Sequence, residues 1–238
     1  MRFKITNTTE TFFKIITTIS DFFIPYIRKK KLYLLTRDFV FYLKKRTSTG
    51  SISSFLGFLL RILVNKPKIF GIGLSKTGKH SLSEALRNLG YNVGYYPKLD
   101  EIMLDSEKYD CLLDIPVILK YKALDKKYPD AKFILTVRNL DKWLKSCEIH
   151  FASKKTLYHK KLRVEIFGAE LYDKEKFTNA WNRHINKVKE YFKGREEDLL
   201  IIDIPSGEGY NKLMAFLGVD YEIYRDKLFP IKNDDGVH

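Results

Sequence analysis

The sequence has few cysteines, no long uncharged apolar run and no cluster of metal ligands, and each absence excludes a class of protein. Cys111 and Cys147 are too few for a disulfide framework, and no C-x-x-C or His/Cys cluster indicates zinc. No uncharged apolar run reaches about 18 residues, so a membrane-spanning helix is not predicted. The initial segment lacks the pattern of a secretory signal. We therefore expect a cytoplasmic protein with two buried thiols.

The positive charge is concentrated in the first part of the chain. Residues 1–66 hold 13 Lys and Arg against 3 Asp and Glu, which gives +10 of the net +14 and leaves +4 for the remainder. A nucleic-acid-binding protein would need a basic stripe on its folded core and a recognisable reader motif. Neither is present, so no nucleic-acid partner is expected.

Residues 1–66 and 67–238 are predicted to be separate domains. The first is a helical extension in which aromatic segments alternate with basic runs such as residues 28–31 and 44–46. That pattern is typical of a helix lying on an anionic membrane surface, so this extension is expected to give the cytoplasmic protein a peripheral membrane contact. The alternative is an extension that packs on the core through its phenylalanines.

The second domain opens with a strand, a glycine-containing loop and a helix. An apolar run at residues 69–73 is followed by Gly78 and by a helix over residues 81–89, with Gly90 as its stop signal. Such a loop directs unpaired backbone N–H groups at one spot, where the dipole of the helix and the charges of Lys76 and Lys79 add to the field. The stretch therefore predicts a site for a phosphate or sulfate group.

Apolar runs and helical patterns alternate along the rest of the domain. This alternation predicts an α/β fold, a three-layer P-loop-like parallel β-sheet flanked by helices. Residues 151–173 carry many charges and little periodicity, which predicts a mobile substrate loop. The expected strands cover residues 69–73, 91–95, 109–115, 132–137 and 199–203, and the expected helices cover residues 81–89, 117–128, 139–150, 174–192 and 210–217.

The anion loop resembles the loops of two families. Gly73 to His80 spells G-x-x-x-x-G-K-H, which differs in one residue from the nucleotide-binding pattern G-x-x-x-x-G-K-[ST], and His80 is a poor magnesium ligand. The same residues resemble the 5′-phosphosulfate loop of sulfotransferases, with Lys76 as its lysine. Thr77, Gly78, Ser81 and Leu82 match that loop, whereas Lys79 and His80 stand where the family generally has two threonines.

Two later segments make the resemblance to sulfotransferases more specific. Arg138 follows the strand at residues 132–137 and Ser146 comes eight residues later, as do the family's contacts to the 3′-phosphate of its donor. An arginine fork and a serine hydroxyl can converge on one phosphate. Asp114 stands where many members have a histidine base. The alternative for Asp114 is an acid that pairs with Lys76 or Lys79. Residues 229–233 are similar to the family's Phe-Pro-His-Lys-Asn ending.

The resemblance implies a sulfotransferase that moves a sulfuryl group from 3′-phosphoadenosine-5′-phosphosulfate (PAPS) to a hydroxyl or amine, without a metal. The acceptor would be a small molecule, a glycan or a lipid. Lys76 and Asp114 would be catalytic, as stabiliser of the leaving phosphate and as base, with His80 as the reserve base. The implied donor-binding residues are Ser75, Lys76, Thr77, Gly78, Lys79, His80, Ser81, Arg138 and Ser146.

Two other functions remain open from the residues. One is a magnesium-dependent P-loop kinase or NTPase, with Lys79 as phosphate lysine and Asp203 as the acid that holds the metal. The other is a non-catalytic membrane-surface binding protein that keeps a degenerate donor fold, which the basic extension and the Lys79-His80 pair make plausible.

Overall fold

The structure, a computed structural model, describes residues 67–153, 156–218 and 227–231. All of them belong to the unit Pro67–His238. The predicted helical extension over residues 1–66 and its membrane contact lie outside the described residues, as do the last two residues of the tail match at 229–233. No described helix has the length and apolar character that crossing a membrane would require.

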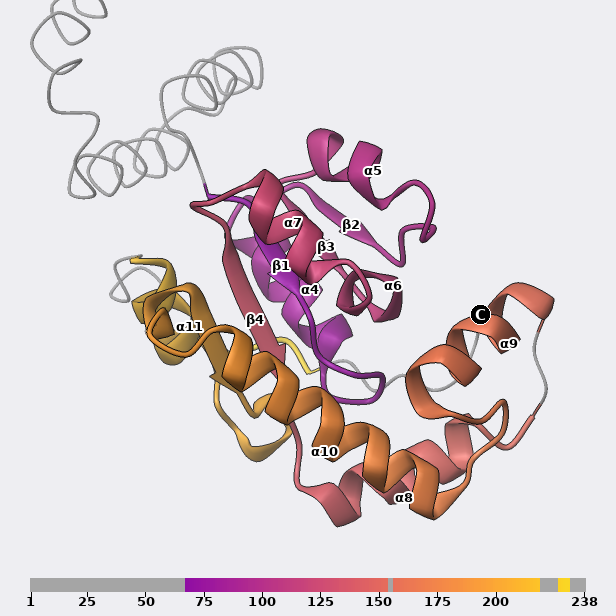
Figure 1. Ribbon diagram of the computed structural model, residues 1–238. Helices are drawn as coiled ribbons and strands as arrows, with labels where there is room; N and C mark the ends of the chain where they lie inside the picture. The colour runs from indigo at the N-terminus through magenta and orange to yellow at the C-terminus, as the bar shows by residue number, and fades with distance from the viewer. Residues whose placement is uncertain (1–66, 154–155, 219–226, 232–238) are drawn as a thin grey trace, which may run out of the picture. The chain divides into compact units, whose positions relative to one another are not determined.

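A parallel sheet of short strands occupies the centre of this unit (Figure 1). Across the sheet the strands follow the order β2-β3-β1-β4-β5, and every pairing is parallel. The strands are β1 (Ile69–Gly71), β2 (Val93–Tyr95), β3 (Cys111–Leu113), β4 (Lys132–Thr136) and β5 (Leu199–Ile202).

The central strand β1 lies between β3 and β4, so the direction of winding reverses at this position. In the register, Ile69 is opposite both Cys111 and Lys132. Ligands of open parallel sheets bind outside the carboxyl ends of the strands, at such a switch point. The segments that follow β1, β3 and β4 therefore occupy the position where a ligand is expected.

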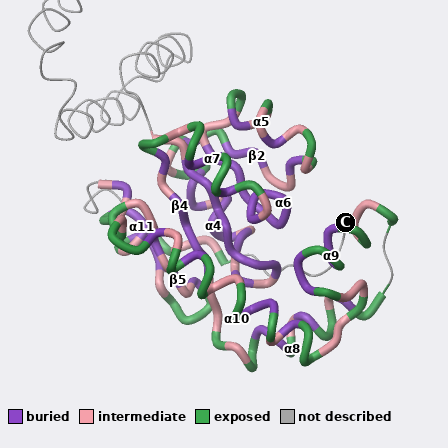
Figure 2. Tube along the Cα trace, in the orientation of Figure 1, coloured by how far each residue is buried: buried purple, intermediate pink, exposed green. Residues whose placement is uncertain are grey.

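Helices cover both faces of the sheet (Figure 1). Side chains alternate along each strand, and Phe70, Leu112, Phe133 and Leu135 join one buried cluster with residues of α6, α7, α8 and α10. α4 and α11 pack on the opposite face. These helices are α4 (Lys79–Asn88), α6 (Ile115–Ile118), α7 (Tyr121–Lys127), α8 (Leu140–His150), α10 (Lys174–Tyr191) and α11 (Tyr210–Leu217). Figure 2 shows the strands buried and the outer surfaces of the helices exposed.

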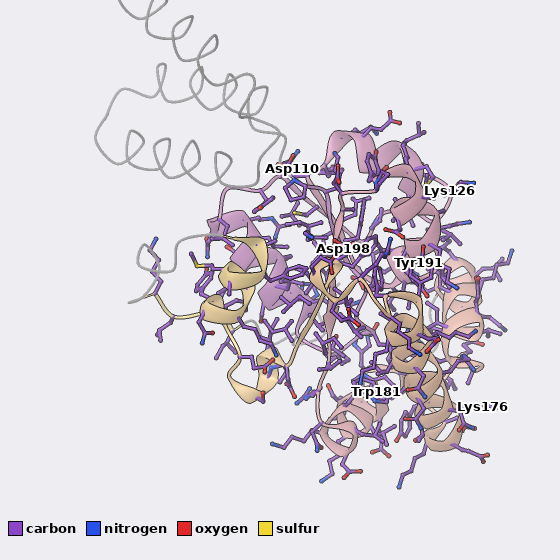
Figure 3. The ribbon with its side chains drawn as sticks, turned by 60° about the vertical axis from the view of Figure 1, so that its left-hand side comes forward. Asp110, Lys126, Lys176, Trp181, Tyr191 and Asp198 are labelled. Atoms are coloured by element: carbon purple, nitrogen blue, oxygen red, sulfur yellow. The ribbon has the colours of Figure 1, made fainter. Side chains whose placement is uncertain are left out.

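A second helical layer is built on α10, which contacts both α8 and α9 (Leu157–Phe167). Trp181 of α10 packs on Trp143 of α8 with ring centroids 4.6 Å apart, whereas Lys176 lies on the exposed side of the same helix (Figure 3). Stacked rings of Phe167 and Phe177, 4.5 Å apart, join α9 to α10. This layer holds α9 against the body of the domain.

The structure confirms the α/β fold with a parallel sheet flanked by helices, and corrects three details. α5 (Ile102–Lys108) was not expected, and the helix predicted over residues 117–128 is divided into α6 and α7. Asp114 caps the start of α6 by accepting the N–H of Ile115. The break lies at Lys120, whose non-helical backbone (φ −119°, ψ 3°) precedes α7. The prediction of a loop over residues 151–173 is wrong, because α9 lies within it. Both cysteines are buried free thiols, as predicted.

Candidate functional site

A cavity of about 1160 Å³ lies at the carboxyl ends of β1, β3 and β4. It brings together all of the predicted site residues except Thr77, which is fully buried beneath the loop. The lining also includes residues of α9 and of the segment after β5. The predicted members are Ser75, Lys76, Gly78, Lys79, His80, Ser81, Asp114, Arg138 and Ser146.

Two glycines give the loop after β1 its close approach to neighbouring backbone. A Cβ on Gly73 would lie 1.9 Å from Thr136 Oγ1 and 2.7 Å from the Thr136 carbonyl oxygen, so only glycine fits there. Gly78 has φ +93° and precedes α4, with Ile204 3.2 Å from the position of its missing Cβ. The loop can therefore lie against both the end of β4 and the segment after β5.

Buried hydrogen bonds fix the loop from below. Thr77 Oγ1 donates to the Leu74 carbonyl at 2.6 Å and lies 2.5 Å from Thr136 Oγ1. Trp143 Nε1 donates to the Ser75 carbonyl at 2.8 Å. These bonds satisfy the inward-facing groups of the loop, and residues 75, 76 and 78–81 line the cavity.

His184 of α10 supports the start of the same loop. Its Nε2 donates to the Ile72 carbonyl oxygen at 2.7 Å. Burial lowers the pKa of His184, and the charges of Lys79 and Arg183 add to this lowering, while the bond to Ile72 opposes it. A neutral imidazole therefore holds the loop in place at neutral pH.

Arg138 and Ser146 face the cavity from the end of β4 and from α8. Arg138 Nη1 donates to the Lys76 carbonyl oxygen at 3.4 Å, so the arginine reaches the anion loop. Its Nε is buried and has no hydrogen-bond partner among the described residues. A buried guanidinium N–H without a partner indicates that this side chain is placed to meet a ligand.

Lys79 and Asp114 form a buried ion pair. The Lys79 ammonium and the Ile115 N–H both act on Asp114 Oδ1, and within the described part of the chain Oδ2 has no hydrogen-bond donor. The pairing of Asp114 with a loop lysine, left open as an alternative to the role of a base, is present. It does not exclude the second role, because Oδ2 remains for a ligand.

Three non-glycine residues of the described chain have positive φ, and all three line the cavity. They are Lys76 at φ 66°, Tyr96 at φ 55° and Asp114 at φ 101°. Such conformations are rare for side chains with a Cβ and cost on the order of 1–3 kcal/mol each. Their concentration at one cavity indicates that the fold tolerates strain there in order to aim these side chains.

Aromatic and imidazole rings form another part of the lining, which the sequence did not predict. His80 packs on Tyr95 with centroids 4.4 Å apart, and Tyr96 stacks on His159 of α9 at 5.6 Å. Burial raises the pKa of Tyr96, and the nearby charge of Asp114 raises it further. The Tyr-Tyr pair at the carboxyl end of β2 was the available signal, since residues at the ends of parallel strands gather at this edge.

Asp203 lies after β5 but is not among the residues that line the cavity. Its Oδ1 accepts the N–H of Ser206 at 3.0 Å and caps the short helix η2 (Ile204–Ser206). Among the described residues, no group of three or more His, Cys, Asp or Glu side chains is arranged to hold a metal ion. The acid expected of the kinase alternative thus has a structural role in the turn.

Comparison of the sequence with protein-family profiles identifies one family. A family profile described as "Sulfotransferase domain" matches residues 97–237, more than half of the chain. The chain belongs to the sulfotransferase family. The matched range includes Asp114, Arg138 and Ser146, whereas the loop at residues 73–81 precedes it.

The solved structures include one similar to this sulfotransferase, described as "Crystal Structure of Sulfotransferase from Alicyclobacillus acidocaldarius". The similarity has a TM-score of 0.45 and 17% sequence identity, and covers 69% of this chain and 84% of that chain. No curated protein matches the chain significantly.

Proposed function

We propose that this sulfotransferase uses PAPS as its donor and transfers the sulfuryl group to a hydroxyl or amine. PAPS carries negative charge at two places on one nucleotide, the 5′-phosphosulfate and the 3′-phosphate. The observation that supports the proposal is the shared cavity: the loop after β1 and the Arg138–Ser146 pair both line it, and Arg138 reaches the Lys76 carbonyl. One nucleotide can therefore occupy both anion sites.

The residues present fit the two anionic groups of that donor. Backbone N–H groups at residues 77–81 and the positive end of α4 would hold the 5′-phosphate, together with the Ser81 hydroxyl. Arg138, whose buried Nε has no partner among the described residues, and Ser146 would hold the 3′-phosphate. Lys79 would add charge to the loop while it keeps Asp114 in position.

The chemistry requires a base for the acceptor and a cation for the leaving group. Asp114 Oδ2 would take the proton from the acceptor as the acceptor oxygen or nitrogen bonds to sulfur. Lys76 would stabilise the charge that develops on the departing phosphate when the bond between sulfur and the bridging oxygen breaks. His80, on the first turn of α4, is the reserve base.

Calorimetric titration tests the donor assignment directly. We expect adenosine 3′,5′-bisphosphate to bind the purified full chain more tightly than adenosine 5′-monophosphate, by about tenfold or more, because the 3′-phosphate makes charge-assisted bonds. Arg138→Ala should remove that difference. Arg87→Ala is the matched control, because Arg87 is a half-exposed arginine of α4 outside the cavity lining.

The same titration separates the alternatives. Tighter binding of ATP with magnesium than of the bisphosphate would favour a kinase or NTPase and overturn the proposal. Liposome binding without affinity for either nucleotide would favour the membrane-surface protein. An unchanged preference in Arg138→Ala would remove Arg138 from the 3′-phosphate site.

A further inference from the structure

Arg163 of α9 is a buried cation that lines the cavity and that the proposed transfer does not use. Arg163 is only 5% exposed, and no carboxylate of the described residues lies within ion-pair distance of its guanidinium. A buried charge without a counter-charge is unfavourable unless something else compensates it.

The surrounding chain fixes the guanidinium but does not neutralise it. Nη1 donates to the carbonyl oxygens of Ser153, at 2.9 Å, and Glu170, at 3.1 Å. The guanidinium carbon lies 4.6 Å from the centroid of the Phe151 ring, which packs against its face. The Glu170 carboxylate pairs with Lys160 at 3.1 Å instead of with Arg163. Arg163 is thus oriented by neutral groups. Burial lowers the pKa of its guanidinium, and the nearby charge of Glu170 opposes that lowering without forming an ion pair.

The other donors of Arg163 are available to a ligand. Nε and Nη2 make no hydrogen bond within the described residues, and neither atom is closed off from solvent. Two neighbouring N–H groups of a fixed guanidinium match the two oxygens of a carboxylate or phosphate. The arginine therefore presents an oxyanion-binding edge within a residue that is otherwise buried.

Tyr96 connects this edge to the predicted base. Burial raises the pKa of the Tyr96 phenol most strongly. The charge of Asp114 raises this pKa further and the charge of Arg163 lowers it, so both charges act on the phenol. The Tyr96 ring also stacks on His159, one turn before Arg163 on α9. All four residues line the same cavity. An anion bound at Arg163 and a hydroxyl bound at Asp114 can therefore belong to one molecule that lies along Tyr96.

We propose that Arg163 binds the acceptor, and that the natural acceptor is an alcohol or amine that also carries an oxyanion: a carboxylate, a phosphate ester or a sulfate ester. This proposal rests on the assignment of the cavity as the transfer site. In the reaction the acceptor oxygen or nitrogen bonds to sulfur, and the bond between sulfur and the bridging phosphate oxygen breaks. The electron pair leaves with adenosine 3′,5′-bisphosphate, and the proton goes to Asp114. Arg163 takes no part in these bond changes and acts in binding alone.

Matched pairs of anionic and neutral ligands test the proposal without knowledge of the acceptor. The probes are para-hydroxyphenylacetate with its amide, glucuronate with glucuronamide, and glycerol phosphate with glycerol. Each is titrated calorimetrically into the full chain, with and without saturating adenosine 3′,5′-bisphosphate. We expect the anionic member of at least one pair to bind about tenfold more tightly or better than its neutral partner. The pair that shows this preference distinguishes a carboxylate from a phosphate ester.

Variants assign the preference to this residue. Arg163→Gln should remove it while leaving the affinity for adenosine 3′,5′-bisphosphate unchanged, and Arg163→Lys should restore part of it. Lys161→Gln is the matched control, because Lys161 is an exposed cation two residues away on the same helix. Urea unfolding of each variant verifies that α9 remains folded.

Three results would overturn the proposal. They are equal binding, or no binding, of both members of every pair; a preference that survives Arg163→Gln in a folded protein; and a loss of bisphosphate affinity in that variant, which would assign Arg163 to the donor. The first two leave the donor assignment intact. Failure of the bisphosphate to bind wild-type protein would instead refute the proposed function and leave the anion preference measurable on its own.

Discussion

The indole N–H of Trp143 on α8 donates a hydrogen bond to the Ser75 carbonyl oxygen in the loop after β1, at 2.8 Å. Trp143 is fully buried, and Ser146 lies one turn further along the same helix. This bond therefore couples the predicted 5′-phosphate loop to the helix that carries a predicted 3′-phosphate contact. We expect the spacing of the two predicted anion sites to depend on this bond.

We expect Trp143→Phe to weaken binding of adenosine 3′,5′-bisphosphate by about fivefold, the equivalent of one hydrogen bond of about 1 kcal/mol. The Ser75 carbonyl would lose its donor, and the loop would gain freedom relative to α8. Calorimetric titration measures the change. Trp181→Phe is the control: Trp181 packs on Trp143 at 4.6 Å and has no bond to the loop in the described structure. Equal losses in both variants would show that the aromatic packing matters and the bond does not.

Lys76→Ala should lower the rate of sulfuryl transfer by about a hundredfold or more, the usual effect of removing one group that stabilises developing charge. The positive φ of Lys76 is equally strained with alanine, so the free energy of unfolding should change little. The rate is measured with radiolabelled donor and urea unfolding is measured in parallel. Lys142→Ala, which removes an exposed lysine of α8, should keep the full rate.

Asp114→Asn should lower the free energy of unfolding by about 3–5 kcal/mol, because it leaves the Lys79 ammonium buried without its carboxylate. Asparagine keeps the oxygen that caps α6, so the cap itself is retained. Combining Asp114→Asn with Lys79→Met should recover much of the stability but no activity. If the single variant unfolds at the same urea concentration as the wild type, the ion pair contributes little to the free energy of unfolding.

Gly73→Ala should lower the free energy of unfolding by about 3 kcal/mol or more, because its Cβ would overlap Thr136 Oγ1 and the Thr136 carbonyl. Relief requires β1 and β4 to separate at the point where the loop leaves the sheet. Gly168→Ala is a matched comparison, since Gly168 has φ +74° and nothing within 4 Å of the added Cβ. Backbone strain alone predicts about 1 kcal/mol there. Similar losses at both glycines would mean that steric overlap is not the cause at Gly73.

The stability of the domain should fall as the pH drops below about 6.5, the ordinary pKa of histidine, because burial lowers the pKa of His184 in the folded state. Above that pH the His184 imidazole is neutral in both the folded and the unfolded chain. As the pH falls, the unfolded chain takes up a proton first and becomes relatively more stable. Urea unfolding at a series of pH values measures this slope. His184→Gln, which can still donate to the Ile72 carbonyl, should show a smaller slope, and an identical slope would assign the effect to other groups.

The sheet, and many of the residues at the carboxyl ends of its strands, could be predicted from patterns in the sequence. Buried parallel strands are continuous apolar runs, so the runs beginning at Ile69, Lys132 and Leu199 are recognisable without tertiary information. Because the carboxyl ends of such strands meet at one edge, residues after separate strands, such as Lys76 and Arg138, could be predicted to share a site. The cavity that they line agrees with this expectation.

What escaped prediction depends on contacts between distant residues or on a broken pattern. The pairing of Asp114 with Lys79, 35 residues away in sequence, could be predicted only as one of two open alternatives, because the choice between Lys76 and Lys79 depends on how the folded loop directs each side chain. α9 was interpreted as a loop because Arg163 interrupts the apolar stripe of Leu162, Ile166 and Phe167 on its buried side. A charged residue on an otherwise apolar helix face conceals the periodicity by which a helix is identified.

The position of α9 has a practical consequence for changing the substrate preference of the enzyme. This helix reaches the cavity from the helical layer on α10, whereas the predicted donor contacts come from the segments after β1 and β4 and from α8. A library of variants restricted to residues 156–163 would therefore leave those contacts unaltered. Such a library offers a direct route to enzymes that have new acceptor preferences and an unaltered predicted donor-binding site.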